Sequence, residues 1–180
     1  MYETNYNPIV FHVILLDNGL RDTESRISAF ERNAWINLNG EWTYSFDFGG
    51  SGLEREWSKS TGFDQKIIVP FCPESKLSGV EYKDFINHMW YHRTISIPQD
   101  WANKQVLLNF GAVYYKSEIY IDGVFAARHF GGTSSFQVDI TPYVKAGQTH
   151  NLVVYVESDV RSTHQPSGKQ NLQFASYACN

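Results

Sequence analysis

The chain has 180 residues, of which 42% are hydrophobic and 19% charged, and its formal net charge is −4. This length suits one domain with a full hydrophobic core, and the acidic balance without clustered Lys and Arg argues against a nucleic-acid partner. The early apolar run 9–16 is too short to cross a membrane, and Glu3 stands where a signal peptide would carry a basic residue. We therefore expect one soluble domain with no membrane segment, in a compartment that the sequence leaves open.

Aromatic residues are unusually frequent, because 12 Phe, 11 Tyr and 5 Trp make up 16% of the chain. Rings suit half-buried strand surfaces, so this enrichment favours β structure. An apolar ring face also stacks on the C–H face of a pyranose, which suits carbohydrate binding. We expect most of the rings to belong to the core of a β protein.

Short strands dominate the pattern along the chain. Residues 1–29 are weakly patterned, and only the run 9–16 is typical of a strand. From Trp35 onward, short apolar runs alternate with turn residues. The predicted strands span residues 41–48, 67–69, 89–97, 105–110, 116–121, 136–140 and 150–156. Asp122-Gly123 predicts a two-residue hairpin after residue 121.

No stretch carries a convincing helical period, so helices are expected only as short turns. We predict such turns at residues 53–57 and 141–145, with Thr141 as the cap of the second and Pro142 at its first position. The whole pattern therefore predicts one all-β domain, either a sandwich or a barrel.

Two groups of side chains have a definite expected placement. Trp90 and His92 face opposite to Tyr91 and Arg93 on one strand, so one pair packs in the core while the other is free to reach a neighbouring domain. Asp139 precedes Ile140-Thr141, and we interpret its carboxylate as satisfying local backbone donors.

Candidate metal ligands are sparse in this sequence. Cys72 and Cys179 lie far apart with no His at metal spacing, and His88 and His92 are separated by about 13 Å of strand. The two cysteines can form one disulfide, although unpaired thiols are the more common case in a domain of this size. We expect no metal site and no cofactor.

Nine short motifs stand in a fixed order between Trp35 and Gln170. They are W-I-N-L-N-G-E-W (35–42), V-P-F-C-P-E-S-K-L-S-G (69–79), M-W-Y-H-R (89–93), Ile97-Pro98 with Trp101, V-L-L-N-F-G-A-V (106–113), I-Y-I-D-G (119–123), H-F-G-G (129–132), F-Q-V-D-I-T-P-Y-V (136–144) and Q-P-S-G-K-Q (165–170). In this order and at this spacing they resemble the N-terminal sugar-binding domain of the family 2 glycoside hydrolases, the β-galactosidase and β-glucuronidase group.

The resemblance implies a jelly-roll β-sandwich, similar to galactose-binding-domain-like folds, over residues 30–180, preceded by an atypical segment 1–29. Two features depart from the family: the loop before Phe136, and residues 1–29, which lack the proline- and arginine-containing lead-in that the family would have. The loop Gly131-Gly132-Thr133-Ser134-Ser135-Phe136 replaces the usual Gly-Gly-Tyr-Thr-Pro-Phe. The strand that closes the sandwich in relatives would follow Cys179, so we expect the last strand to be missing and a sheet edge to be exposed for pairing with another chain.

The resemblance places catalysis outside this chain. Retaining glycosidases need two carboxyl groups about 5 Å apart. In the family both are glutamates on a barrel that follows this domain and an immunoglobulin-like one, and a barrel takes roughly 250 residues. The chain also has no hydrolase, zincin or phosphate-loop motif. We therefore expect no catalytic residue in this chain, and we expect its parent protein to be a glycoside hydrolase.

The resemblance implies that this domain supports the barrel and lends loops to the rim of the substrate pocket. The corresponding segments are residues 82–88 and 168–177. The rim candidates are Tyr82, Asp84, Asn87, Lys169 and Gln170. Two alternatives remain open: a free-standing carbohydrate-binding module, and a protein-interaction domain that forms homo-oligomers through an exposed edge.

Overall fold

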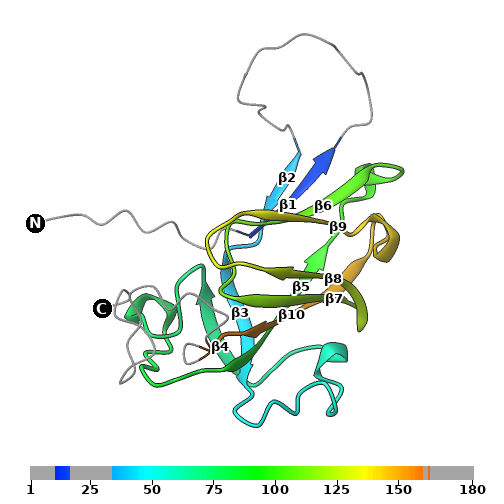
Figure 1. Cartoon of the computed structure of the whole chain (residues 1–180). Helices are drawn as coiled ribbons and strands as arrows, with labels where there is room; N and C mark the ends of the chain where they lie inside the picture. Colours follow the sequence, from blue (N-terminus) through cyan, green and yellow to red (C-terminus); the bar gives the residue numbers. More distant parts are fainter. Residues whose placement is uncertain (1–10, 17–33, 160–161, 163–180) are drawn as a thin grey trace, which may run out of the picture.

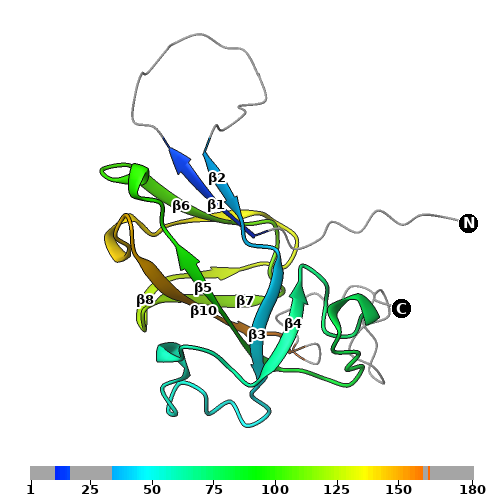
Figure 2. The ribbon, with the colours of Figure 1, turned by 180° about the vertical axis from the view of Figure 1, so that it is seen from behind.

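The computed structural model describes residues 11–16, 34–159 and 162, and within them the protein is a sandwich of two antiparallel β-sheets (Figures 1 and 2). One sheet has the strand order β2-β1-β6-β9, and the other β4-β3-β5-β10-β7-β8. The strands are β1 (Phe11–Leu16), β2 (Trp35–Asn37), β3 (Gly40–Phe46), β4 (Gln65–Val69), β5 (His88–Ser96), β6 (Gln105–Phe110), β7 (Lys116–Ile121), β8 (Val124–Phe130), β9 (Phe136–Asp139) and β10 (Thr149–Glu157). Four single-turn 3₁₀ helices connect them: η1 (Trp57–Lys59), η2 (Lys76–Ser78), η3 (Gln99–Trp101) and η4 (Thr141–Tyr143).

The predicted hairpin at Asp122-Gly123 is confirmed. Ile121 pairs with Val124 across it, so the loop between β7 and β8 has two residues. Both loop residues have positive φ, 49° at Asp122 and 80° at Gly123, as a turn matching the strand twist requires. The Asp122 carboxylate also accepts hydrogen bonds from the His150 ring and the Asn151 N–H, which join the turn to β10.

Strand β1 comes from the atypical segment 1–29 and lies inside the four-stranded sheet. It pairs with β2 on one side and with β6 on the other, where Phe11 opposes Phe110. This segment therefore leaves no open edge beside β6. Whether the chain lacks a closing strand stays a prediction, because residues 163–180 lie outside the described part.

The main core lies between the two sheets. Leu108 on β6, Ile119 on β7 and Leu152 on β10 are each fully buried there. Trp42 on β3 joins this core and donates its indole N–H to the Leu38 carbonyl at 2.7 Å. Inward positions alternate with outward ones along these strands, as the period of two predicts.

A second, smaller core covers the outer face of the six-stranded sheet. Trp90, Tyr120, Val153 and Tyr155 are buried there, and Trp57 packs on them from the loop that contains η1. Asp47, which is 4% exposed, holds this loop. Its carboxylate accepts the N–H groups of Ser51 (3.0 Å) and Gly52 (2.8 Å) and the indole N–H of Trp90 (3.0 Å).

The alternation predicted for residues 90–93 is observed, but both pairs are engaged inside the described part of the domain. Trp90 and His92 are buried on the outer face. Tyr91 packs against the main core. Arg93 donates through one guanidinium nitrogen to the carbonyls of Leu38, Asn39 and Glu41. Contact of the half-buried Tyr91 and Arg93 with a neighbouring domain stays a prediction.

Two local expectations need correction. The turn at 141–145 is the 3₁₀ helix η4, whose cap is Ile140, so Thr141 does not cap it. Its first N–H is instead accepted by Asp139 at 2.9 Å, which confirms the local structural role expected for that carboxylate. Cys72 is disulfide-bonded, which differs from the expected unpaired thiol; Cys179 lies outside the described residues.

Candidate functional site

Residues 70–87 connect β4 to β5 and form one end of the sandwich (Figure 1). Ser78 organises this connection although it is almost fully buried. Its hydroxyl donates to the Ser75 carbonyl at 2.7 Å and accepts the Val80 N–H at 3.1 Å. The Tyr82 N–H donates to the Pro73 carbonyl. These bonds fold a connection of irregular backbone into a fixed shape.

Tyr82 is half-buried in an aromatic cluster that sequence reasoning did not foresee. Its ring centroid lies 4.9 Å from that of Phe46 and 5.9 Å from that of Phe48. Phe46 is at the end of β3, and Phe48 follows it with 61% of its surface exposed. The cluster therefore fixes the Tyr82 ring while leaving aromatic surface open at this end of the domain.

The other predicted rim residues lie on the same connection but are not joined to Tyr82. Asp84 is exposed, and its carboxylate accepts the N–H of Phe85. Asn87 is exposed, and its carbonyl accepts the Ser158 N–H, which ties the end of the connection to the residue after β10. Among the described residues no hydrogen bond links Tyr82, Asp84 and Asn87 to one another. Lys169 and Gln170 lie outside the described residues.

Glu74 is an acidic group of this segment that the sequence did not single out. Burial raises the pKa of its carboxyl above the ordinary value, and its own backbone hydrogen bond opposes that rise only in part. The pKa of the neighbouring Tyr91 phenol is also raised, first by burial and then by the charges of Glu74 and Tyr44. In the sequence, Glu74 is marked only by its position in the V-P-F-C-P-E-S motif, and that position does not indicate whether the residue is buried.

The loop that departs from the family pattern keeps both of its glycines for structural reasons. Gly131 has φ of 122°, a backbone conformation that disfavours other residues. A Cβ at Gly132 would collide with the ring of Tyr114. The residues that replace the usual aromatic and proline, 133–135, are all exposed. The Gly-Gly pair therefore forms a tight stretch of backbone that larger residues would not fit.

The chemistry that these groups can perform is recognition. Hydroxyl, carboxylate and amide groups next to open aromatic surface can bind a polyol, but they include no nucleophile paired with a base. In the described part of the chain, no group of three or more His, Cys, Asp and Glu side chains is placed to hold a metal ion. No helix found there is long and apolar enough to span a membrane.

Residues 36–167 match the family model described as the sugar-binding domain of the family 2 glycosyl hydrolases. The chain belongs to this family. The matched range covers every strand from β3 to β10, the connection of residues 70–87 and the Gly-Gly loop.

The relatives that match this family 2 domain are enzymes much longer than this chain. A β-glucuronidase of Paenibacillus borealis is 25% identical over 134 residues, which are 74% of this chain and 22% of that protein. A β-galactosidase of Thermoanaerobacter pseudethanolicus is 27% identical over 146 residues, which are 74% of this chain and 18% of that protein. The chain thus spans about a fifth of the length of the curated relatives it matches.

Solved structures show the same fold. The β-glucuronidase of Ruminococcus gnavus in complex with uronic isofagomine matches with a TM-score of 0.58 and 25% identity, over 67% of this chain and 20% of that one. Family 2 membership and the β-sandwich fold, both expected from the ordered motifs, are therefore confirmed.

Proposed function

We propose that this family 2 domain is a non-catalytic accessory domain of a retaining exo-β-glycosidase of the β-glucuronidase or β-galactosidase type. Its role is to support the catalytic barrel and to shape the rim of the substrate pocket with residues 70–87. The observation that carries the proposal is the fixed Tyr82 ring, which packs on Phe46 and Phe48 at one end of the sandwich beside the exposed Asp84 and Asn87.

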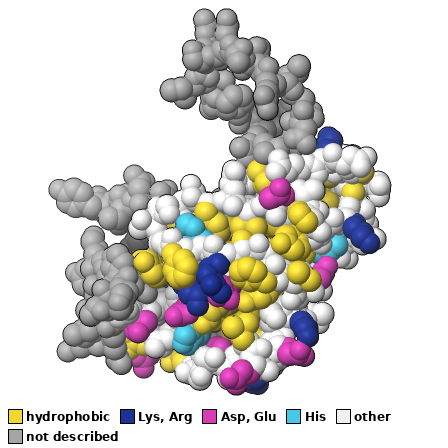
Figure 3. Space-filling view, turned by 45° about the vertical axis from the view of Figure 1, so that its right-hand side comes forward, with side chains coloured by type: hydrophobic (Ala, Val, Ile, Leu, Met, Phe, Trp, Pro, Cys, Tyr) yellow, Lys and Arg dark blue, Asp and Glu magenta, His cyan; other side chains and the backbone are white. Residues whose placement is uncertain are grey.

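Exposed hydrophobic surface supports a role within a larger protein. Figure 3 shows hydrophobic side chains gathered over a broad part of one face, with basic and acidic side chains among them. Large hydrophobic residues are also exposed at the rim end, where Leu77 has 65% of its surface open and Phe71 38%. Contiguous apolar surface of this kind commonly marks contacts with other domains. Barrel and immunoglobulin-like domains of the parent are the partners that the family provides.

A chimaera tests the proposal. Residues 11–159, which include β1, would replace the matched domain of the Ruminococcus gnavus β-glucuronidase, and hydrolysis of an aryl β-glucuronide would be followed. We expect an active chimaera in which Tyr82→Ala raises KM about threefold to tenfold with little change in kcat, because a rim residue contributes substrate binding of hydrogen-bond size. Asp84→Ala and Asn87→Ala should act in the same direction.

Phe125→Ala is the matched control, because it removes an exposed aromatic ring from β8, outside the rim segment. An active chimaera in which the triple variant at Tyr82, Asp84 and Asn87 leaves both KM and kcat unchanged would refute the rim role. A folded but inactive chimaera would refute the proposal that this domain supports the catalytic barrel.

A further inference from the structure

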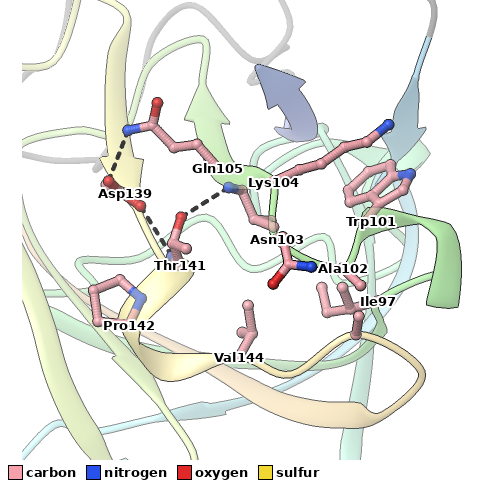
Figure 4. A pocket seen from close by; sticks show the side chains of 12 residues that line it. Ile97, Trp101, Ala102, Asn103, Lys104, Gln105, Asp139, Thr141, Pro142 and Val144 are labelled. Carbon is pink, nitrogen blue, oxygen red and sulfur yellow. Dashed lines mark hydrogen bonds between the residues drawn. The ribbon is translucent and has the colours of Figure 1, made fainter. Parts of the chain in front are cut away.

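A wide-mouthed cavity of about 790 Å³ is lined by segments that lie across the sandwich from residues 70–87. Figures 1 and 2 show the placement of these segments. Three segments build the cavity: the loop with η3, the first residues of β6, and the turn from β9 into η4. Pockets of this size accommodate small organic ligands. Figure 4 shows Gln105, Asp139 and Thr141 on one side of the cavity, with Trp101 and Ile97 across from them.

The polar wall of the cavity is held in place by its own hydrogen bonds. Asp139 accepts the Thr141 N–H at 2.9 Å with one oxygen and the Gln105 side-chain amide at 2.8 Å with the other. The Thr141 hydroxyl oxygen accepts the Val106 N–H at 2.8 Å. The three side chains therefore have fixed orientations before any ligand arrives, which lowers the entropic cost of binding.

This wall keeps hydrogen-bonding capacity for a ligand. The Thr141 hydroxyl can still donate, the Gln105 amide oxygen can still accept, and each Asp139 oxygen has a further lone pair. Such a mixture of donors and acceptors matches sugar hydroxyls, since each hydroxyl both donates and accepts. Pro142 is exposed and Val144 half-buried, so these two supply the apolar surface open to the C–H groups of a pyranose. Ile97 and Trp101, on the opposite side, are almost fully buried.

The charges of the cavity favour a neutral ligand. In Figure 4 the Lys104 side chain extends on the side of Trp101, away from Asp139. Burial opposes ionisation of Asp139, but the hydrogen bonds from Thr141 and Gln105 outweigh it and lower the pKa of its carboxyl below the ordinary value. The hydrogen-bonding wall thus carries a carboxylate, which repels an acidic sugar placed against it, whereas the positive charge of Lys104 lies on the opposite side of the cavity.

We propose that this cavity binds a neutral pyranose or a short neutral oligosaccharide. The site is separate from residues 70–87, so it does not depend on the proposed role at the substrate rim. It would hold a neutral glycan on the domain at a distance from the catalytic pocket of the parent.

Amide NMR of the ¹⁵N-labelled 180-residue chain tests this site. The probes are methyl β-glucopyranoside, methyl β-galactopyranoside, cellobiose and methyl β-glucuronide. We expect a neutral probe to cause saturable shifts of the Gln105 and Thr141 amides, with a Kd of about 1–10 mM. Gln105→Leu should weaken binding about tenfold, because it removes one hydrogen-bonding group from the wall.

Gln137→Leu is the matched control, since it changes an exposed glutamine on the same strand as Asp139 but outside the cavity. It should leave the Kd unchanged, as should Tyr82→Ala. No saturable shift of the cavity amides at about 100 mM of any neutral probe would overturn the proposal. Shifts confined to residues 82–87 would overturn it while supporting the rim role, and tighter binding of the glucuronide would overturn the assignment to neutral sugars. The wild-type titration decides the matter even if Gln105→Leu does not fold.

Discussion

The two faces of the six-stranded sheet are both buried, but different forces hold them. The inner face contributes apolar side chains such as Ile119 and Leu152 to the main core. The outer face carries aromatic rings whose polar atoms are paired with buried carboxylates. Trp90 donates to Asp47, and Tyr120 donates to Glu118 at 2.6 Å.

On the outer face, therefore, the aromatic residues can be buried because their polar atoms have hydrogen-bond partners. Glu118 is 3% exposed and also pairs with Arg128 at 2.9 Å and Lys116 at 3.5 Å. Burial opposes its ionisation, but the hydrogen bond from Tyr120 and the charges of Lys116 and Arg128 prevail, so the pKa of its carboxyl is lowered. A buried carboxylate without such partners would be strongly unfavourable. We therefore expect stability to fall when side-chain volume is removed from the inner face. On the outer face, it should fall when a hydrogen-bond acceptor is removed or when the pH is lowered.

The largest effect should follow from removing volume on the inner face. Leu152 is fully buried between the sheets, so Leu152→Ala leaves a cavity and should lower the free energy of unfolding by about 3 kcal/mol. Urea denaturation followed by circular dichroism measures the change. Val124→Ala, at a position 55% exposed on β8, should cost less than about 0.5 kcal/mol. A loss below about 1 kcal/mol at Leu152 would show that the core is loosely packed.

Asp47→Asn should lower the free energy of unfolding by about 2 kcal/mol, which is less than the loss expected for Leu152→Ala. Whichever way the new amide is oriented, its NH₂ group faces a donor, either Ser51 N–H or the pair formed by Gly52 N–H and Trp90 Nε1–H. Loss of this anchor should also change tryptophan fluorescence, because the ring centroids of Trp57 and Trp90 are 6.2 Å apart. If Asp47→Asn were neutral, the claim that the outer face depends on its acceptors would fail.

Glu118→Gln should have the smallest effect of the three and lower the free energy of unfolding by about 1 kcal/mol near pH 7. The folded pKa of Glu118 lies below its ordinary value of 4.5. The carboxylate therefore stabilises the protein above that pH, and its contribution is lost as the pH falls through the folded pKa. Urea denaturation of both proteins should show a difference in unfolding free energy near pH 7 that closes as the pH falls below 4.5. The exposed Glu54→Gln should show no such difference, and a difference that widens in acid would contradict the prediction.

The sequence predicted much of the sheet structure, and its failures have physical causes. The runs 105–110 and 116–121, predicted as strands, match β6 and β7 residue for residue. The three-residue β2 is too short to show a period, and β8 reads V-F-A-A-R-H-F, in which small and charged residues interrupt the alternation. Packing against neighbours, which a single sequence does not display, makes these segments strands.

The candidate site was less accessible from the sequence. Tyr82 was identified through the family resemblance, but its partners Phe46 and Phe48 come from β3 and the residues after it. The cavity beside Gln105 is built from three segments whose lining residues lie between Ile97 and Ala146, and no sequence motif marks it. Asp139 was correctly given a local structural role, yet its second oxygen bonds Gln105 from another strand.

The pairing of β1 with β6 sets a limit on how the chain can fold. Phe11 opposes Phe110, so residues 99 positions apart must meet before the four-stranded sheet exists (110 − 11 = 99). Pairing at this separation slows completion of the sheet, because a long loop must close before the contacts between β1 and β6 are gained. During synthesis, β1 can pair with β2 early, but nearly a hundred residues must follow it before it can pair with β6.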